Sequence, residues 1–153
     1  MMSFEIQSDM RNLPEVEGFV ERLCDNSNIG NHSAIITMAL LNAVENAIVH
    51  GNRNDNSKKV YISCEQNANT LLFRVRDEGD GFPYEDYNDL DKLLDEFSDG
   101  MFLLKTLCDE ISFDEGGSVL CMSFSIKGVG HHIAAKRVSV LQHFYASEAI
   151  GVV

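Results

Sequence analysis

Cysteine is scarce in this sequence, with four residues in 153, namely Cys24, Cys64, Cys108 and Cys121. They lie far apart, form no Cys-x-x-Cys pair and have no histidine at the spacing of a metal ligand. This pattern favours buried, reduced thiols over a disulfide framework or a metal site.

Long hydrophobic runs are also missing. No segment approaches the roughly 18 apolar residues of a membrane span. The amino-terminal stretch MMSFEIQSDM has no basic segment followed by an apolar one, so no signal peptide is predicted. We therefore expect a cytoplasmic protein that does not enter a membrane.

Positive charge is the third thing the chain has little of. It carries 12 Lys and Arg against 24 Asp and Glu, a formal net charge of −12. Such a charge argues against direct contact with a nucleic-acid backbone or an anionic membrane surface. An acidic surface suits a basic protein partner, although acidity most often serves solubility alone. A bound nucleotide would need Mg²⁺, helix N-termini or a few cations to supply a positive field.

What is present indicates one domain with an ordinary core. Apolar spacing predicts a short strand at 4–7 and helices over 8–28 and 31–50, the second stopped by Gly51. Two strands at 58–66 and 69–79 follow, then an acidic connector over 80–99 with a short helix at 89–97, a helix opened by Gly100, and a hairpin over 111–126. This order predicts an α/β (α+β) two-layer sandwich, with a mixed, mainly antiparallel sheet covered on one face by helices.

Three short segments carry the chemistry. Asn42 and Asn46, both candidates for nucleotide binding, lie one turn apart on the predicted helix 31–50. Asp77-Glu78-Gly79-Asp80-Gly81, a DxGxG, comes directly after a strand, and Ser98-Asp99-Gly100-Met101 opens a helix after the acidic connector. Each pattern is weak alone. On a helix, a strand end and a helix start, in this order, they are strong in combination.

The combination resembles the GHKL ATP-binding superfamily, which includes gyrase, heat-shock chaperone, histidine kinase and mismatch-repair ATPases. The closest likeness is to the small bacterial anti-sigma-factor serine kinases, and it covers roughly residues 3 to 127. The matching stretches are AVENAIVHGN, FRVRDEGDGF, GMFLLKTLCDEI and GGSVLCMSF. The resemblance implies a Bergerat-type ATP-binding domain over 1–127, with 128–153 as an appended helical tail. It also implies ATP and Mg²⁺ as cofactors, a sigma factor and an anti-sigma-factor antagonist as partners, and a possible homodimer.

The resemblance assigns a role to each matched residue. Asn46 would offer a hard amide oxygen to Mg²⁺ held between phosphates, although such an amide can also bond only to local backbone. Asp77 would accept a hydrogen bond from the exocyclic amine of adenine and so select adenine over guanine. Gly79 and Gly81 would allow close approach of the backbone; the alternative is an ordinary acidic turn. Gly100 and Met101 would bring free helix N–H groups to the phosphates, and Ser118 would lie near the adenine.

Asn42 departs from the serine-kinase pattern. Those kinases have a glutamate four residues before the magnesium-binding asparagine, thought to act as the general base. An amide cannot accept a proton at neutral pH, so the catalytic base is missing at this position. Glu45 is the candidate substitute, but it lies about 100° around the helix axis from Asn46, which does not favour it.

The acidic connector is a second departure. It carries one lysine, Lys92, and the usual GxG before the helix is reduced to Ser98-Asp99-Gly100. Carboxylates close to a triphosphate cost about 1 kcal/mol per pair unless Mg²⁺ intervenes, which predicts weak nucleotide binding unless the acids face solvent. The acids between Gly81 and Gly100 are Glu85, Asp86, Asp89, Asp91, Asp95, Glu96 and Asp99.

Two functions therefore stay open. One is an ATP-dependent protein serine kinase that binds a sigma factor and phosphorylates an antagonist protein. The other is a catalytically weak or inactive binding module of the same fold, which acts by holding its partner. A phosphotransfer partner of another kind is a third, weaker alternative. Likeness to the serine kinases favours the first, whereas Asn42 and the acidic connector favour the second.

Overall fold

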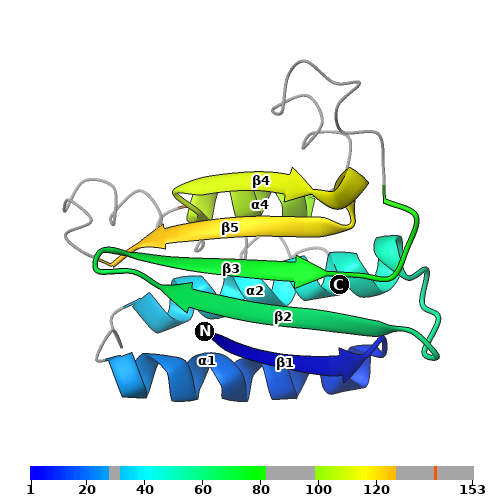
Figure 1. The fold of residues 1–153 in the computed structure, drawn as a ribbon, viewed down its shortest axis with the longest axis horizontal. Coiled ribbons are helices and arrows are strands. Elements are labelled where there is room, and N and C mark those ends of the chain that lie inside the picture. Colours follow the sequence, from blue (N-terminus) through cyan, green and yellow to red (C-terminus); the bar gives the residue numbers. More distant parts are fainter. Residues whose placement is uncertain (28–31, 82–98, 127–139, 141–153) are drawn as a thin grey trace, which may run out of the picture.

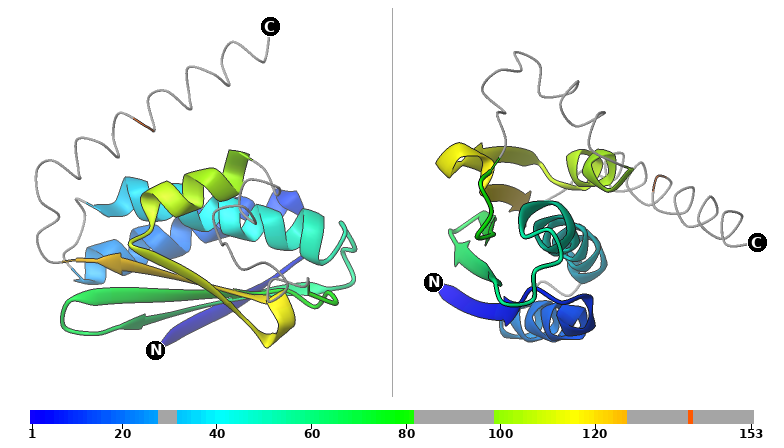
Figure 2. Two further views of the ribbon diagram at one scale, coloured as in Figure 1. Left: turned by 90° about the horizontal axis from the view of Figure 1, so that it is seen from above. Right: turned by 90° about the vertical axis from the view of Figure 1, so that its right-hand side faces the viewer.

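The chain folds into an open sheet of five strands with helices packed on one face (Figures 1 and 2). The computed structural model describes residues 1–27, 32–81, 99–126 and 140. The strands are β1 (Met2–Gln7), β2 (Lys59–Gln66), β3 (Thr70–Arg76), β4 (Glu110–Asp114) and β5 (Val119–Ser125). The helices are α1 (Leu13–Ser27), α2 (Ser33–Asn46) and α4 (Asp99–Leu107), with single turns at Met10–Asn12, Ala47–Gly51 and Glu115–Gly117. This arrangement confirms the predicted two-layer α/β sandwich.

The sheet order is β1-β2-β3-β5-β4, and every pair of neighbours among the described strands is antiparallel. A mixed, mainly antiparallel sheet was predicted; the antiparallel pairing is confirmed, and no parallel pair occurs among the described strands. β5 folds back from β4 as a hairpin and inserts beside β3. β3 and β4 therefore run in the same direction but are separated by β5, so they never become parallel neighbours.

Alternation along the strands builds the core. In β2 and β3 every second side chain is buried, including Ile62 and Phe73, and these side chains face the helices. The intervening side chains point to the opposite face of the sheet, which no described helix covers (Figure 2, right). The hydrophobic stabilisation of the domain therefore comes from a single layer between sheet and helices.

Helix α2 lies at the centre of the helical layer, packed between α1 and α4. Ile36, Leu40 and Val44 on this helix are fully buried. Together with the turn that follows, Ser33–Gly51 forms one run of 19 residues with a mean hydropathy of 1.3, which is long and apolar enough to cross a membrane. The sequence analysis expected no such run. The central helix of a folded core meets the same criterion, so the run is weak evidence for a membrane span.

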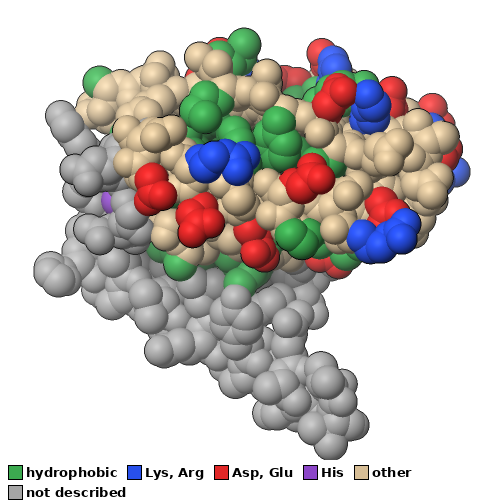
Figure 3. Space-filling model, turned by 90° about the horizontal axis from the view of Figure 1, so that it is seen from below, with side chains coloured by type: hydrophobic (Ala, Val, Ile, Leu, Met, Phe, Trp, Pro, Cys, Tyr) green, Lys and Arg blue, Asp and Glu red, His purple; other side chains and the backbone are tan. Residues whose placement is uncertain are grey.

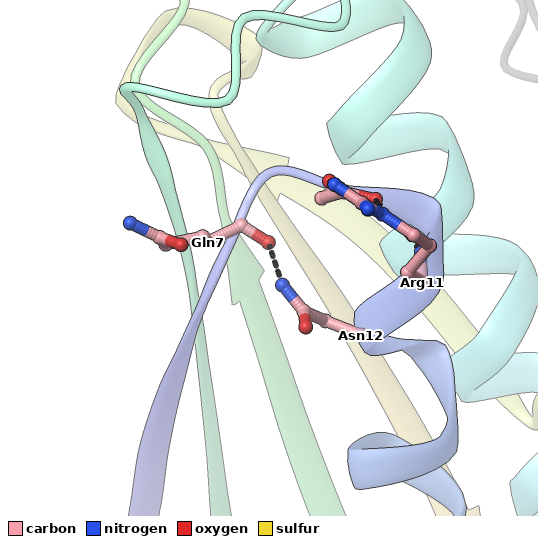
Figure 4. Close-up of polar contacts among 4 residues, drawn as sticks. Gln7, Arg11 and Asn12 are labelled. Carbon is pink, nitrogen blue, oxygen red and sulfur yellow. Dashed lines mark hydrogen bonds and ion pairs between the residues drawn. The ribbon is translucent and has the colours of Figure 1, made fainter.

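The corner between β1 and α1 is closed by polar contacts (Figure 4). The Asp9 carboxylate accepts from the backbone N–H of Arg11 at 2.9 Å and so caps the turn that precedes α1. Hydrogen bonds from Arg11 hold the pKa of Asp9 at about 2. Asn12 Nδ2 donates to the Gln7 carbonyl oxygen at 3.1 Å. These contacts fix the direction in which α1 leaves the sheet.

Acidic side chains are spread over the surface on the side where α1 and β1 lie, with a few lysines and arginines among them (Figure 3). The exposed large hydrophobic residues in the described part of the chain are Met1, Met2 and Met10. The helices predicted at 89–97 and in the tail over 128–153 fall outside the described residues, apart from Val140.

Candidate functional site

A pocket opens where the carboxyl end of α2 meets the ends of β3 and the β4–β5 hairpin. Its apolar walls come from α2, β3, β4 and β5, and its polar groups come from Asn46, Asp77 and Ser118. Segments far apart in the sequence therefore converge on one space. The lining residues are Ala43, Asn46, Ala47, His50, Gly51, Val75, Asp77, Gly81, Phe113, Gly117, Ser118 and Leu120.

Asp77 leaves β3 at the edge of this pocket and is half-buried. Its Oδ1 accepts from the N–H of Gly79 at 2.8 Å, and its own N–H donates to the Ser118 carbonyl oxygen at 3.0 Å. Burial raises the pKa of the Asp77 carboxyl, although the Gly79 hydrogen bond and the charge of Lys58 act in the opposite direction. A partly desolvated carboxylate with free lone pairs is a strong acceptor for a ligand N–H.

Two glycines allow the backbone to close around Asp77. A Cβ atom on Gly51 would collide with the Asp77 carboxyl group, and one on Gly79 would collide with the Gly51 carbonyl oxygen. Both neighbours are held by the surrounding fold, so neither contact could be relieved by a simple side-chain rotation. The end of α2 and the DxGxG turn are therefore in direct contact, and that contact requires glycine on both sides.

Gly81 needs glycine for a second reason. Its φ angle is +75°, in the left-handed region, and a Cβ atom there would collide with the Gly116 carbonyl oxygen in the β4–β5 turn. The DxGxG turn therefore also touches the hairpin that carries Ser118. Ser118 lines the pocket, and its Oγ donates to the Glu115 carbonyl oxygen at 3.0 Å.

Asn46 is the last residue of α2, half-buried and in the pocket lining. The helix widens directly after it into one π-helical turn, Ala47–Gly51, closed by the Asn52 N–H donating to the Ala47 carbonyl oxygen at 2.8 Å. Such turns insert one residue into a helix and often occur at functional sites. Here the turn carries both His50 and Gly51 to the pocket.

Asn42 has a different environment from Asn46. Its Nδ2 donates to the Met38 carbonyl oxygen one turn earlier, at 2.8 Å, and Asn42 is not among the pocket-lining residues. Glu45 is exposed and does not line the pocket either. The structure therefore brings Asn46, Asp77, Gly81 and Ser118 together and leaves Asn42 and Glu45 outside that set. The role of Asn42 in nucleotide binding stays a prediction.

Gly79 and Gly100 stand apart from the lining for separate reasons. Gly79 holds the Asp77 carboxylate by donating its N–H to Oδ1. Gly100 and Met101 lie in the first turn of α4, as predicted for the helix start. The side-chain surroundings of 99–102 and the whole of Ser98 fall outside the described residues, as do the other acids of the connector.

All four cysteines are free and buried, as predicted. Burial raises the pKa of the Cys64 thiol to about 12 and also raises that of Cys24. Among the described residues, no three His, Cys, Asp or Glu side chains are grouped as a metal site would require. The Asn46 amide oxygen, together with oxygens of the ligand itself, could hold a metal at this pocket.

Sequence reasoning missed several residues of the site. Gly51 was taken only as a helix stop, and His50 and Asn52 were given no role. Asn52 is almost completely buried, and its amide connects two segments that flank Asp77. The available signal was the stretch His50-Gly51-Asn52 directly after Asn46, since a buried amide after a helix end needs specific partners.

The fold and this pocket define an α/β sandwich with one half-buried carboxylate facing an apolar cleft. The sequence model of the histidine kinase-like ATPase domain matches residues 6–124. The chain belongs to this family, which makes it an ATP-binding domain of the histidine kinase-like type. None of the curated proteins matches the sequence.

Proposed function

We propose that this pocket binds ATP with the adenine against Asp77 and a magnesium ion at Asn46. The observation that carries the proposal is the convergence of Asp77, Asn46 and Ser118 on one cleft. The residues fit the ligand. Val75, Phe113 and Leu120 supply apolar walls for a planar base, and the Asp77 carboxylate supplies the acceptor for its amine.

The finer proposal is that the domain is a protein serine kinase-like anti-sigma factor. In this role it binds a sigma factor and an antagonist protein and phosphorylates a serine on the antagonist. Support comes from the likeness of the stretches around Asn46, Asp77 and Gly100 to the anti-sigma-factor serine kinases. Transfer to a serine hydroxyl depends more on phosphate positioning by Mg²⁺ than on a base, so Asn42 weakens this proposal without removing it.

The second candidate is a binding module that holds its partner without phosphotransfer. The amide of Asn42, which stands where the serine kinases have their base, donates to the Met38 carbonyl oxygen of its own helix. Glu45, the substitute base, is exposed and outside the pocket lining. These two observations favour a domain in which nucleotide binding persists while catalysis is weak.

Calorimetric titration tests the nucleotide site. ATP with Mg²⁺ is expected to bind the wild type more tightly than GTP does, because the guanine carbonyl would face the Asp77 carboxylate. Removal of Mg²⁺ should weaken ATP binding to the wild type more than to Asn46→Ala. Equal affinities for ATP and GTP would remove the adenine assignment, and an unchanged magnesium dependence in Asn46→Ala would remove the metal assignment.

A phosphotransfer assay separates the two candidates. Labelled ATP, Mg²⁺ and a candidate antagonist protein are incubated with the wild type and with Asn42→Glu. Phosphate transferred to serine by the wild type rules out the inactive module. If only Asn42→Glu transfers phosphate, the kinase proposal fails and the natural chain is a binding module whose base has been lost.

A further inference from the structure

Asn52 is one of two polar residues that are almost fully buried in the described part of the chain, with 1% of its surface exposed. Both atoms of its amide group are used. Nδ2 donates to the Lys59 carbonyl oxygen at 3.0 Å, and Oδ1 accepts from the Glu78 N–H at 2.8 Å. Its backbone N–H also closes the π-helical turn after α2. A buried amide whose nitrogen and oxygen are both hydrogen-bonded holds its neighbours in one arrangement.

Those neighbours surround the carboxylate of the proposed adenine site. Glu78 directly follows Asp77, and Lys59 is the first residue of β2. The Glu78 side chain returns to accept from the Lys59 N–H, so the turn is tied to β2 twice. Gly51, the residue before Asn52, packs against the Asp77 carboxyl group from the other side. Asn52 therefore joins α2, β2 and the DxGxG turn at one point.

The hydrogen bonds of Asn52 control the orientation of the Asp77 carboxylate. A hydrogen bond weakens steeply once its angle falls below about 120°. The proposed contact between the Asp77 carboxylate and the exocyclic amine is a single hydrogen bond, so no second bond would compensate for a poor angle. The Asp77 carboxylate must therefore be held still relative to the walls of the pocket. Side chains that fix a binding group by packing and hydrogen bonding typically set its specificity.

We propose that Asn52 is a positioning residue for base recognition: by fixing the Asp77–Gly79 turn it sets the preference of the pocket for a 6-amino purine over a 6-oxo purine. This inference rests on the proposed function, since it assumes that Asp77 contacts the exocyclic amine. If Asn52 has a purely structural role, loss of its amide should lower the affinity for both purines alike. If Asn52 positions Asp77, loss of its amide should lower the affinity only for the purine that uses the Asp77 hydrogen bond.

The test compares ATP with inosine triphosphate, which carries a carbonyl in place of the amine. Both are titrated calorimetrically into the wild type and into Asn52→Ala, with folding checked by circular dichroism. The ATP affinity of Asn52→Ala is expected to fall about tenfold, as for partial loss of a hydrogen bond to a charged group. Its affinity for inosine triphosphate should change less than about twofold. Equal losses for both nucleotides would overturn the inference.

Two further variants keep the test decisive. Glu78→Ala removes an exposed side chain and its hydrogen bond from the Lys59 N–H, so the variant should fold. The ratio of its affinity for ATP to its affinity for inosine triphosphate should shift in the same direction as in Asn52→Ala, by a smaller factor. Asn12→Ala is the matched control, since Asn12 Nδ2 also donates to a backbone carbonyl, at the distant β1–α1 corner. The ratio of the two affinities in Asn12→Ala should equal that of the wild type.

The other possible results of these titrations also decide the inference. If Asn52→Ala does not fold, an unchanged ratio in Glu78→Ala overturns the inference. A shifted ratio in Asn12→Ala would show that general loosening is sufficient, and would overturn it as well. A wild type that binds both nucleotides equally would instead refute the adenine contact of Asp77 and thus the premise.

Discussion

The turn around Asp77 and the middle of α2 around Asn42 differ in how their polar groups are held. At the Asp77 turn the carboxylate accepts from the Gly79 N–H, and the Asn52 amide bonds to the Glu78 N–H of the same turn and to the Lys59 carbonyl oxygen at the start of β2. At Asn42 the amide bonds only to its own helix by the contacts that the structure records, and Glu45 beside it is exposed. Buried polar groups are costly unless they are paired. The Asp77 turn therefore depends on hydrogen bonds between distant segments, whereas the Asn42 bond lies within one helix.

The difference separates binding from catalysis. The Asp77 turn has the rigidity and the partly desolvated carboxylate that selective recognition of a base requires. Asn42 and the candidate base Glu45, by contrast, do not line the pocket.

Replacement of Asp77 should separate affinity from stability. In Asp77→Asn one carboxylate oxygen becomes an NH₂ donor, so the side chain can no longer offer one oxygen to the Gly79 N–H and the other to the adenine amine, and ATP affinity should fall roughly 10- to 100-fold. The melting temperature of the free protein should rise, because the carboxylate whose pKa is raised by burial is removed. Calorimetry and thermal unfolding measure the two effects.

Asp80→Asn is the matched control for this substitution. It makes the same charge change three residues further along the turn, at an exposed side chain outside the pocket lining. Affinity and melting temperature should both stay close to those of the wild type. An equal loss of ATP affinity in both variants would mean that general charge, and not the Asp77 contact, controls binding.

Addition of a single methyl group should test the contact between α2 and the turn. In Gly79→Ala the new Cβ would collide with the Gly51 carbonyl oxygen, so unfolding free energy should fall by about 1–3 kcal/mol. ATP binding should weaken with it. Denaturant titration measures the loss.

Gly18→Ala provides the comparison for the same methyl group. Gly18 lies inside α1, where a Cβ would meet only the flexible end of Arg22. The substitution should stabilise the protein by up to about 1 kcal/mol, because alanine favours a helix. If Gly79→Ala were tolerated as well as Gly18→Ala, the close approach at Gly51 would not exist in solution.

The pH dependence of stability should report the burial of Asp77. Its pKa is raised in the folded protein above the ordinary value of 3.8, so the folded state holds this proton more tightly than the unfolded state. The cost of ionising Asp77 is absent below pH 3.8 and is imposed as pH rises through the folded pKa. The gap in melting temperature between Asp77→Asn and the wild type should therefore widen with pH and then become constant. A gap independent of pH would contradict the burial of this group.

Sequence patterns predicted the elements well because the relevant signals are local. The alternation in β2 and β3, the apolar spacing of α1 and α2, and the hairpin over 111–126 all depend on neighbours within a few residues. Strand adjacency does not. The sequence orders the strands but cannot say that β5 inserts beside β3, so it could not exclude the parallel pair that a mixed sheet would contain.

The site divides in the same way. Asn46, Asp77, Gly81 and Ser118 were predicted from short motifs, and all four line the pocket. The role of Asn52 depends on Glu78, 26 residues further along the chain, and on a π-helical turn that the continuous apolar pattern through Ile48 conceals. Such a role becomes visible only when the segments are brought together in space.

The smallest expected effect belongs to Asn42 and tests the other half of the contrast. Asn42→Ala removes a bond to the helix's own backbone and introduces a better helix former, so unfolding free energy should change by no more than about 0.5 kcal/mol. ATP affinity should change less than about twofold, because Asn42 does not line the pocket. Asn46→Ala, one turn later, should instead lose most of the magnesium dependence of ATP binding. A tenfold loss of ATP affinity in Asn42→Ala would place both amides at the nucleotide, and the middle of α2 would then belong to the binding site as fully as the Asp77 turn does.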